Sequence, residues 1–162
     1  MKGPLNTLWR RKAGDPWQGT NTDAEAFEQS LSKLEPGPVL LLGEGGVAHT
    51  SRAILDGVGR PVLQASRRFP LAAEAVSALA PVGIVQATSL GMSGMDPVPF
   101  PQLLEAARPS ARWAVEWIYK EDTAFALWAR EAGLRLVEGM TLFDTQAEAQ
   151  SRRFIEGCGG VN

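Results

Sequence analysis

Residues 39–42 read Val-Leu-Leu-Leu, and this apolar run ends in the turn Gly-Glu-Gly-Gly at 43–46, after which a helical pattern begins. A strand that is apolar at every position is typical of a parallel sheet that helices cover on both faces. A glycine-rich turn between such a strand and a helix is also a place where free N–H groups bind phosphate. This segment therefore favours an α/β fold with a nucleotide site at the end of a strand.

Further apolar runs alternate with helical patterns along the chain, which indicates repeated βαβ units. Strands connected in this way lie parallel in one sheet, with the connecting helices packed on its faces. We therefore expect an α/β, Rossmann-type, doubly wound, mainly parallel sheet with helices on both faces. The expected strands are 39–42, 62–65, 83–87, 114–118 and 134–137, and the expected helices are 47–56, 71–79, 101–107, 123–132 and 141–156.

The first 36 residues have a different pattern and precede the first strand of this sheet. Residues 5–10 and 17–19 are expected to be short strands, because turn-forming residues separate them. Thr22 is followed three residues later by Glu25, which predicts a capping box and a helix from about 23 to 34. We expect a single domain over 1–162, with residues 1–36 before a Rossmann core at 37–138 and a C-terminal helical segment at 139–162.

Composition narrows the class of protein further. The 16 basic and 18 acidic residues give a net charge of −2, which argues against a general nucleic-acid surface. One cysteine, Cys158, and one histidine, His49, exclude an internal disulfide and a metal site built from these residue types, so no metal is expected. No apolar run reaches the ~18 residues of a membrane helix, and residues 1–4 lack the apolar core of a signal peptide. A soluble, cytoplasmic protein is the expectation.

The glycine-rich turn has a separate expected role for each small residue. Gly43 allows the tight turn, Gly45 lets a pyrophosphate approach the backbone, and Ala48 permits close packing of helix on strand. The alternative is a tight βα turn that binds no ligand. Glu44 is the objection to binding, because a carboxylate beside a pyrophosphate is repulsive unless it points to solvent.

The end of the second expected strand bears on the choice of cofactor. An NAD site usually has an acidic residue there for the ribose hydroxyls, whereas this chain has Ser66, Arg67 and Arg68. Because a guanidinium binds phosphate through two hydrogen bonds, these arginines favour NADP over NAD. The plainer alternative is a solvated basic turn.

Seven segments in one order resemble the motifs of the shikimate dehydrogenase family. Two of them match in full, Gly-Thr-Asn-Thr-Asp at 19–23 and Ala-Thr-Ser-Leu-Gly-Met at 87–92, and the glycine-rich turn resembles the family's Gly-Ala-Gly-Gly-x-Ala loop. The other segments are 6–8, 66–68, Tyr119 and 139–146. The resemblance covers nearly the whole chain.

The resemblance implies NADP-dependent interconversion of 3-dehydroshikimate and shikimate, in aromatic amino-acid biosynthesis. Asp23 matches the aspartate beside the substrate hydroxyl that loses its proton, and Asn6, Tyr119 and Gln146 match residues that contact substrate. The positions that match the cofactor lining are Gly43, Glu44, Gly45, Gly46, Val47, Ala48, Ser66, Arg67, Arg68, Thr88, Trp117 and Gly139. Without the resemblance these residues have plainer roles, such as an acid at the positive end of a helix for Asp23.

The chain also departs from the family pattern. The family has a substrate domain before the Asn-Thr-Leu strand, and the catalytic lysine and the serines for the substrate carboxylate lie in it. Here that strand starts at Asn6, so residues 1–36 match the region between the two domains and the chain is expected to be incomplete for catalysis. Glu116 and Gln86 replace the usual aspartate and asparagine, and Asp144 stands where an apolar residue is usual.

Three alternatives therefore remain. The chain is the NADP-binding part of a shikimate dehydrogenase, a non-catalytic Rossmann module that binds or regulates, or an assembly partner that has lost the dinucleotide. An apolar face that the missing domain would normally cover favours a homodimer.

Overall fold

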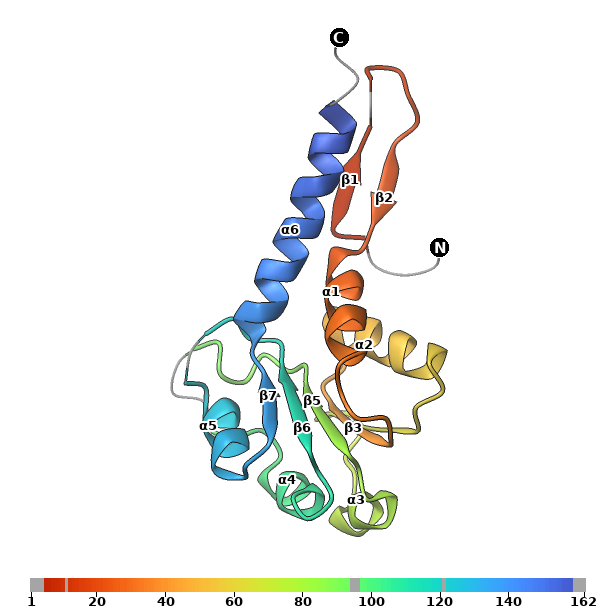
Figure 1. Cartoon of the computed structure of the whole chain (residues 1–162). Coiled ribbons are helices and arrows are strands. Elements are labelled where there is room, and N and C mark those ends of the chain that lie inside the picture. The colour runs from red at the N-terminus through yellow and green to blue at the C-terminus, as the bar shows by residue number, and fades with distance from the viewer. Residues whose placement is uncertain (1–4, 11, 94–96, 121, 159–162) are drawn as a thin grey trace.

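The computed structural model describes residues 5–10, 12–93, 97–120 and 122–158. Within these residues the chain forms a central five-stranded sheet, a separate two-stranded sheet and six helices (Figure 1). The central strands are β3 (Val39–Leu42), β4 (Val62–Ala65), β5 (Gly83–Gln86), β6 (Trp113–Glu116) and β7 (Arg135–Val137).

The central sheet is parallel throughout and has the order β4-β3-β5-β6-β7. The chain begins the sheet at β3, places β4 on one side of it, and then places β5 on the other. Leu42 at the end of β3 is paired with Ala65 on one side and Gln86 on the other. The reversal in strand order creates a switch point beyond the carboxyl ends of β3 and β5, where sheets of this kind bind ligands.

The helices form two layers, one on each face of the sheet. Alternate residues of β3 point to opposite faces: Leu41 packs into one core with α1 (Thr22–Leu31), α2 (Gly46–Gly57) and α6 (Gly139–Cys158). Leu40 packs into the other core, with α3 (Ala73–Leu79), α4 (Pro101–Ala107) and α5 (Ala124–Glu131). The prediction of a doubly wound α/β fold with helices on both faces is confirmed.

The N-terminal residues form a hairpin that stands apart from the central sheet. Its strands, β1 (Thr7–Trp9) and β2 (Gln18–Thr20), are antiparallel. Figure 1 shows this hairpin beside the outer part of α6, and α6 also packs along α1. The first and last segments of the described chain are thus brought together at one end of the molecule.

The predicted start of the first helix is wrong in detail. Asn21, not Thr22, is the N-cap residue: its backbone is extended and its side-chain oxygen accepts from the N–H of Ala24 at 3.2 Å. Thr22 is already helical, and Glu25 accepts from the hydroxyl of Thr20 instead of closing a capping box. The helix also ends at Leu31 rather than near residue 34.

The other predicted elements are present, with ends that differ by a few residues. Strand 39–42 and helix 101–107 have the expected bounds, whereas α6 begins at Gly139, two residues early. None of the helices in the described part of the chain is long and apolar enough to cross a membrane. Residues 1–4, on which the argument about a signal peptide rests, lie outside the described residues.

Candidate cofactor and substrate site

A cavity of about 380 Å³ lies at the switch point of the sheet. Its walls come from the segments that follow β3, β4 and β5, so three strand ends open into it. A volume of this size is within the usual range of small-molecule sites. The residues that line it are Gly43, Glu44, Gly45, Val47, Ser66, Arg67, Ala87, Thr88, Ser89, Leu90, Met92 and Phe100.

Gly43 fixes the path of the glycine-rich turn. Its φ is +122°, and a Cβ at this position would lie 2.4 Å from the carbonyl oxygen of Ala87. Its N–H donates to the carbonyl of Ala65 at 2.8 Å, and its own carbonyl accepts from the side-chain amide of Gln64, also at 2.8 Å. Hydrogen bonds therefore hold the turn against β4, and the close approach of Ala87, which follows β5, leaves room only for glycine at position 43.

Gly45, in contrast to Gly43, has open space beside its Cα. It is the N-cap residue of α2, and a Cβ built on it would have no atom within 4 Å. Gly46 opens the helix and is equally uncrowded, whereas Ala48 is fully buried in the core. The N-terminus of α2 therefore leaves open space beside unpaired backbone N–H groups, which a phosphate can approach.

Glu44 turns toward the carboxyl end of β4. The hydroxyl of Ser66 donates to its Oε2 at 2.7 Å, and the same hydroxyl accepts from the backbone N–H groups of Arg68 and Phe69. Arg67 lines the cavity, whereas the guanidinium of Arg68 lies over the ring of Phe69, 5.9 Å from its centroid. The cavity thus has an acidic and a basic side chain at the same end.

A buried amide holds the loop after β5. The Nε2 atom of Gln86 donates to the Thr88 hydroxyl at 2.9 Å and to the carbonyl of Leu90 at 3.1 Å, and its Oε1 accepts from the N–H of Thr88 at 3.0 Å. Thr88 is therefore fixed at the cavity wall. In the sequence, the signal for this role is a polar residue, Gln86, at the end of an otherwise apolar strand.

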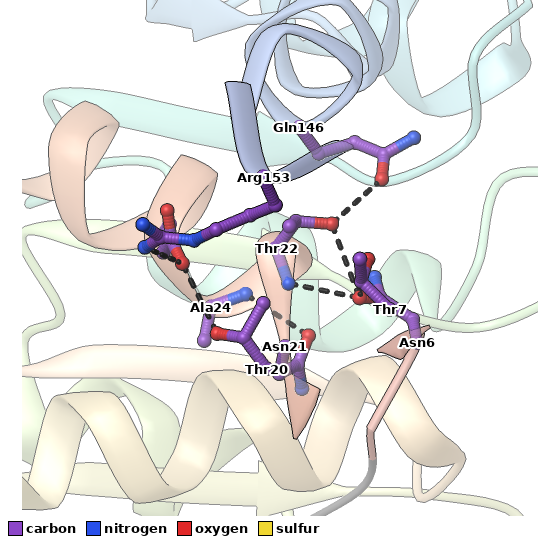
Figure 2. Close-up of polar contacts among 9 residues, drawn as sticks. Asn6, Thr7, Thr20, Asn21, Thr22, Ala24, Gln146 and Arg153 are labelled. Carbon is purple, nitrogen blue, oxygen red and sulfur yellow. Dashed lines mark hydrogen bonds and ion pairs between the residues drawn. The ribbon is translucent and has the colours of Figure 1, made fainter. Parts of the chain in front are cut away.

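A second cluster of polar residues lies where β1, α1 and α6 meet (Figure 2). The side-chain oxygen of Asn6 accepts from the backbone N–H of Thr22 at 2.9 Å, from the Thr22 hydroxyl at 3.1 Å and from the Thr7 hydroxyl at 3.0 Å. The Thr22 hydroxyl also lies 3.0 Å from Oε1 of Gln146 on α6. Since a hydroxyl carries one proton, it donates to one of these two oxygens at a time.

Asp23 stands next to Thr22, in the first turn of α1, and is half-buried. Burial raises the pKa of its carboxyl group, and a hydrogen bond from the Asn6 side chain acts in the opposite direction. The structure therefore brings three of the predicted substrate-site residues, Asn6, Asp23 and Gln146, to one corner of the molecule.

An ion pair ties the outer end of α6 to the same corner. The guanidinium of Arg153 lies 3.1 Å from Oε1 of Glu25, and the Thr20 hydroxyl donates to that oxygen at the same distance. This contact joins α6, α1 and β2, and Figure 2 labels two of its residues, Arg153 and Thr20. The ion pair is therefore a second link between α1 and α6, besides the contact of Thr22 with Gln146.

Tyr119 is exposed and projects from the loop after β6. Its ring centroid lies 5.3 Å from that of Phe143, which is one turn before Gln146 on α6. Tyr119 therefore lies near the α6 surface that carries Gln146, and in the described residues no hydrogen bond links it to the Asn6 cluster.

Two residues expected near the cofactor, Trp117 and Gly139, have structural contacts and do not line the cavity. The indole N–H of Trp117 donates to the Ser51 hydroxyl at 3.0 Å, and its ring lies 5.8 Å from that of Phe27, outside the cavity lining. At Gly139, a Cβ would lie 2.1 Å from the carbonyl oxygen of Ile118. Their contact with cofactor stays a prediction.

Glu116 is a buried carboxyl group at the end of β6. It accepts from the Thr123 hydroxyl at 2.7 Å and from the N–H of Ile118 at 3.3 Å, so it fixes both ends of the loop that carries Tyr119. Burial raises the pKa of Glu116 to about 7, although both hydrogen bonds act to lower it. The described residues contain no group of three or more His, Cys, Asp or Glu side chains that could hold a metal ion.

Comparison with known proteins shows what the chain as a whole is similar to. A shikimate dehydrogenase (NADP(+)) of Anaeromyxobacter sp. (strain Fw109-5) is 32% identical over 164 residues, which cover 85% of this chain and 56% of that protein. A second one, from Synechocystis sp., is 28% identical and covers 95% of this chain and 62% of its own length. The chain is a relative of the shikimate dehydrogenases. No family model matches it.

Solved shikimate dehydrogenases have the same fold. The enzyme of Thermus thermophilus, solved in complex with NADP(H) and shikimate, superimposes with a TM-score of 0.68 at 24% identity and covers 89% of this chain and 59% of its own. This shikimate dehydrogenase relative therefore spans little more than half the length of the proteins it matches.

Proposed function

We propose that this chain is the NADP-binding part of a shikimate dehydrogenase and that NADP binds in the cavity at the switch point. The observation that carries the proposal is the combination, in one cavity, of an open helix N-terminus at Gly45 with Arg67 at the end of β4. The first suits a pyrophosphate, and the second suits a 2′-phosphate. The names of the relatives agree with this cofactor.

The Asn6 cluster is the proposed substrate corner, for shikimate and 3-dehydroshikimate. When bound in the cavity, NADPH would donate a hydride to 3-dehydroshikimate, and NADP(+) would accept one from shikimate in the reverse direction. Asn6 and Gln146 present amide groups that can bind substrate hydroxyls, and Asp23 presents a carboxyl group with a raised pKa that can hold a proton. Tyr119 would contact substrate from the loop after β6.

Catalysis needs more than these residues. A reaction that moves a proton requires a positioned acid or base and residues that hold the substrate in place. In the family, the catalytic lysine and the serines that bind the substrate carboxylate belong to the substrate domain. We propose that turnover requires such a domain in addition to residues 1–162. A cytoplasmic location and a homodimer likewise stay predictions.

A non-catalytic binding module is the second candidate, and one observation favours it. Glu44 accepts the hydrogen bond of the Ser66 hydroxyl inside the cavity, so a negative charge already lies in the wall where a phosphate would bind. If the carboxylate prevents dinucleotide binding altogether, the fold remains but the chemistry is lost.

Isothermal titration calorimetry of the purified chain with NADPH and NADH tests the proposal. Calorimetry is preferable to fluorescence, because none of the five tryptophans lines the cavity. We expect saturable binding of NADPH that Arg67→Ala weakens, because this guanidinium lines the cavity. Arg108→Ala is the matched control, since this arginine lies outside the cavity lining and its side chain forms an exposed ion pair with Glu105. Failure of both dinucleotides to bind would contradict the proposal.

A further inference from the structure

One wall of the cavity contains a hydrogen bond between the segments that follow two neighbouring strands, β3 and β4. Glu44 belongs to the turn after β3, but its carboxylate is bonded to Ser66 at the end of β4, 22 positions later in the chain. Arg67 follows Ser66 directly and lines the same cavity. Both charges therefore face the part of the site that follows β4.

The hydroxyl of Ser66 is fully used in this arrangement. Ser66 is only 3% exposed, and its oxygen accepts from the N–H groups of Arg68 at 3.2 Å and Phe69 at 3.0 Å. Its single proton goes to Glu44 at 2.7 Å. A phosphate oxygen that is to accept the Ser66 proton must first displace the Glu44 carboxylate.

The end of the second strand is where a dinucleotide's adenosine ribose lies in a sheet of this type. A carboxylate there accepts a hydrogen bond from a 2′-hydroxyl, but it repels a 2′-phosphate, which is itself an anion. We propose that Glu44 is a specificity-determining residue, which opposes the NADP preference supplied by Arg67 by competing with the 2′-phosphate for Ser66. The inference rests on the proposed function, because it requires a dinucleotide in this cavity.

The position of Glu44 explains how it can be tolerated in a glycine-rich turn. A carboxylate beside the N-terminus of α2 would compete with the pyrophosphate, whereas its bond to Ser66 turns it toward the ribose end of the cavity. Its effect is therefore expected to depend on the 2′ substituent, which NADPH and NADH do not share.

The test compares NADPH with NADH on Glu44→Gln. Glutamine keeps the size of the side chain and an oxygen for Ser66, and it removes only the charge. We expect the Kd for NADPH to fall about tenfold, while that for NADH stays constant or rises a few-fold. Glu131→Gln removes the same charge from the end of α5 and should leave both values unchanged. Circular dichroism verifies the folding of each variant.

Each outcome decides the matter. A fall in the Kd for NADPH alone supports the proposal. Equal improvement for both dinucleotides would place Glu44 at the pyrophosphate and overturn it. If each dinucleotide binds and neither Kd changes in Glu44→Gln, this proposal is overturned, and the proposed function stays intact. Absence of binding in the wild type and in Glu44→Gln would overturn both.

Discussion

The side-chain oxygen of Asn6 accepts the backbone N–H of Thr22 at 2.9 Å, and this bond fixes the start of β1 to the start of α1. Thr22 is fully buried, so its N–H has no water to replace that oxygen. Asn6 therefore has a structural role besides the substrate contact proposed for it.

Asn6→Ala is expected to destabilise the chain. The variant leaves the buried N–H of Thr22 without its acceptor, which costs about 1–3 kcal/mol, whereas the Thr22 hydroxyl can still donate to Gln146. Urea unfolding followed by circular dichroism measures the difference. Ser32→Ala, which removes an exposed hydroxyl bonded to Gln29, is the control and should change stability little. A loss for Asn6→Ala no larger than that of the control would contradict the role of this bond.

Gly43 and Gly45 are expected to respond in opposite ways to alanine. Gly43→Ala forces a side chain into a left-handed backbone and against the carbonyl of Ala87, so it should lose stability by more than about 2 kcal/mol. Gly45→Ala meets no atom, so it should cost less than about 1 kcal/mol but weaken NADPH binding. Thermal unfolding and calorimetry separate the two effects. Normal NADPH affinity in Gly45→Ala would argue against a phosphate at the α2 N-terminus.

The stability of the wild type is expected to fall as the pH rises from about 4.5 to about 7. In that window folded Glu116, whose pKa is about 7, keeps a proton that the unfolded chain has released at the ordinary value of 4.5. Folding therefore binds protons there, and a higher pH opposes it. Below and above the window this group contributes no slope.

Glu116→Gln tests this pH dependence. The substitution removes the titration, and the change in stability between pH 4 and pH 8 should shrink by on the order of 3 kcal/mol. Urea unfolding at several pH values measures it, and the slope is the relevant quantity because glutamine also alters the bond to Thr123. If wild type and variant have the same pH profile, Glu116 does not titrate in this range.

Asp23→Asn is expected to separate binding from chemistry. Asp23 does not line the cavity, so the Kd for NADPH should stay within twofold. When the chain is fused to the substrate domain of a relative, the same variant should lower kcat by at least about 100-fold, as for the loss of an acid–base group. An unchanged kcat in the active fusion would remove Asp23 from the proton transfer.

Local patterns explain why so much of the fold could be predicted. The apolar run of β3, the glycines after it and the helical spacing of α2 are all read from neighbouring residues, and each element lies where expected. The N-cap at Asn21 was missed because both Asn21 and Thr22 can cap a helix, and only the tertiary bonds of Thr22 decide between them.

The interactions that could not be predicted join residues far apart in the chain. The Glu44–Ser66 bond depends on how β3 and β4 pair, and the Thr22–Gln146 contact spans 124 positions. Trp117 shows the same limit: its hydrogen bond to Ser51 on α2 spans 66 positions and could not be predicted from the sequence. Sequence motifs show which residues take part, and packing determines what each one touches.

The two clusters are also completed at different times during synthesis. Every residue that lines the cavity lies between Gly43 and Phe100, whereas the Asn6 cluster waits for Gln146 on the last helix. Because chains fold from the N-terminus as they leave the ribosome, the strands that form the cavity are made before the Asn6 cluster can close. A ribosome stalled before α6 would therefore carry a nascent chain that holds the cavity residues but lacks Gln146 of the Asn6 cluster.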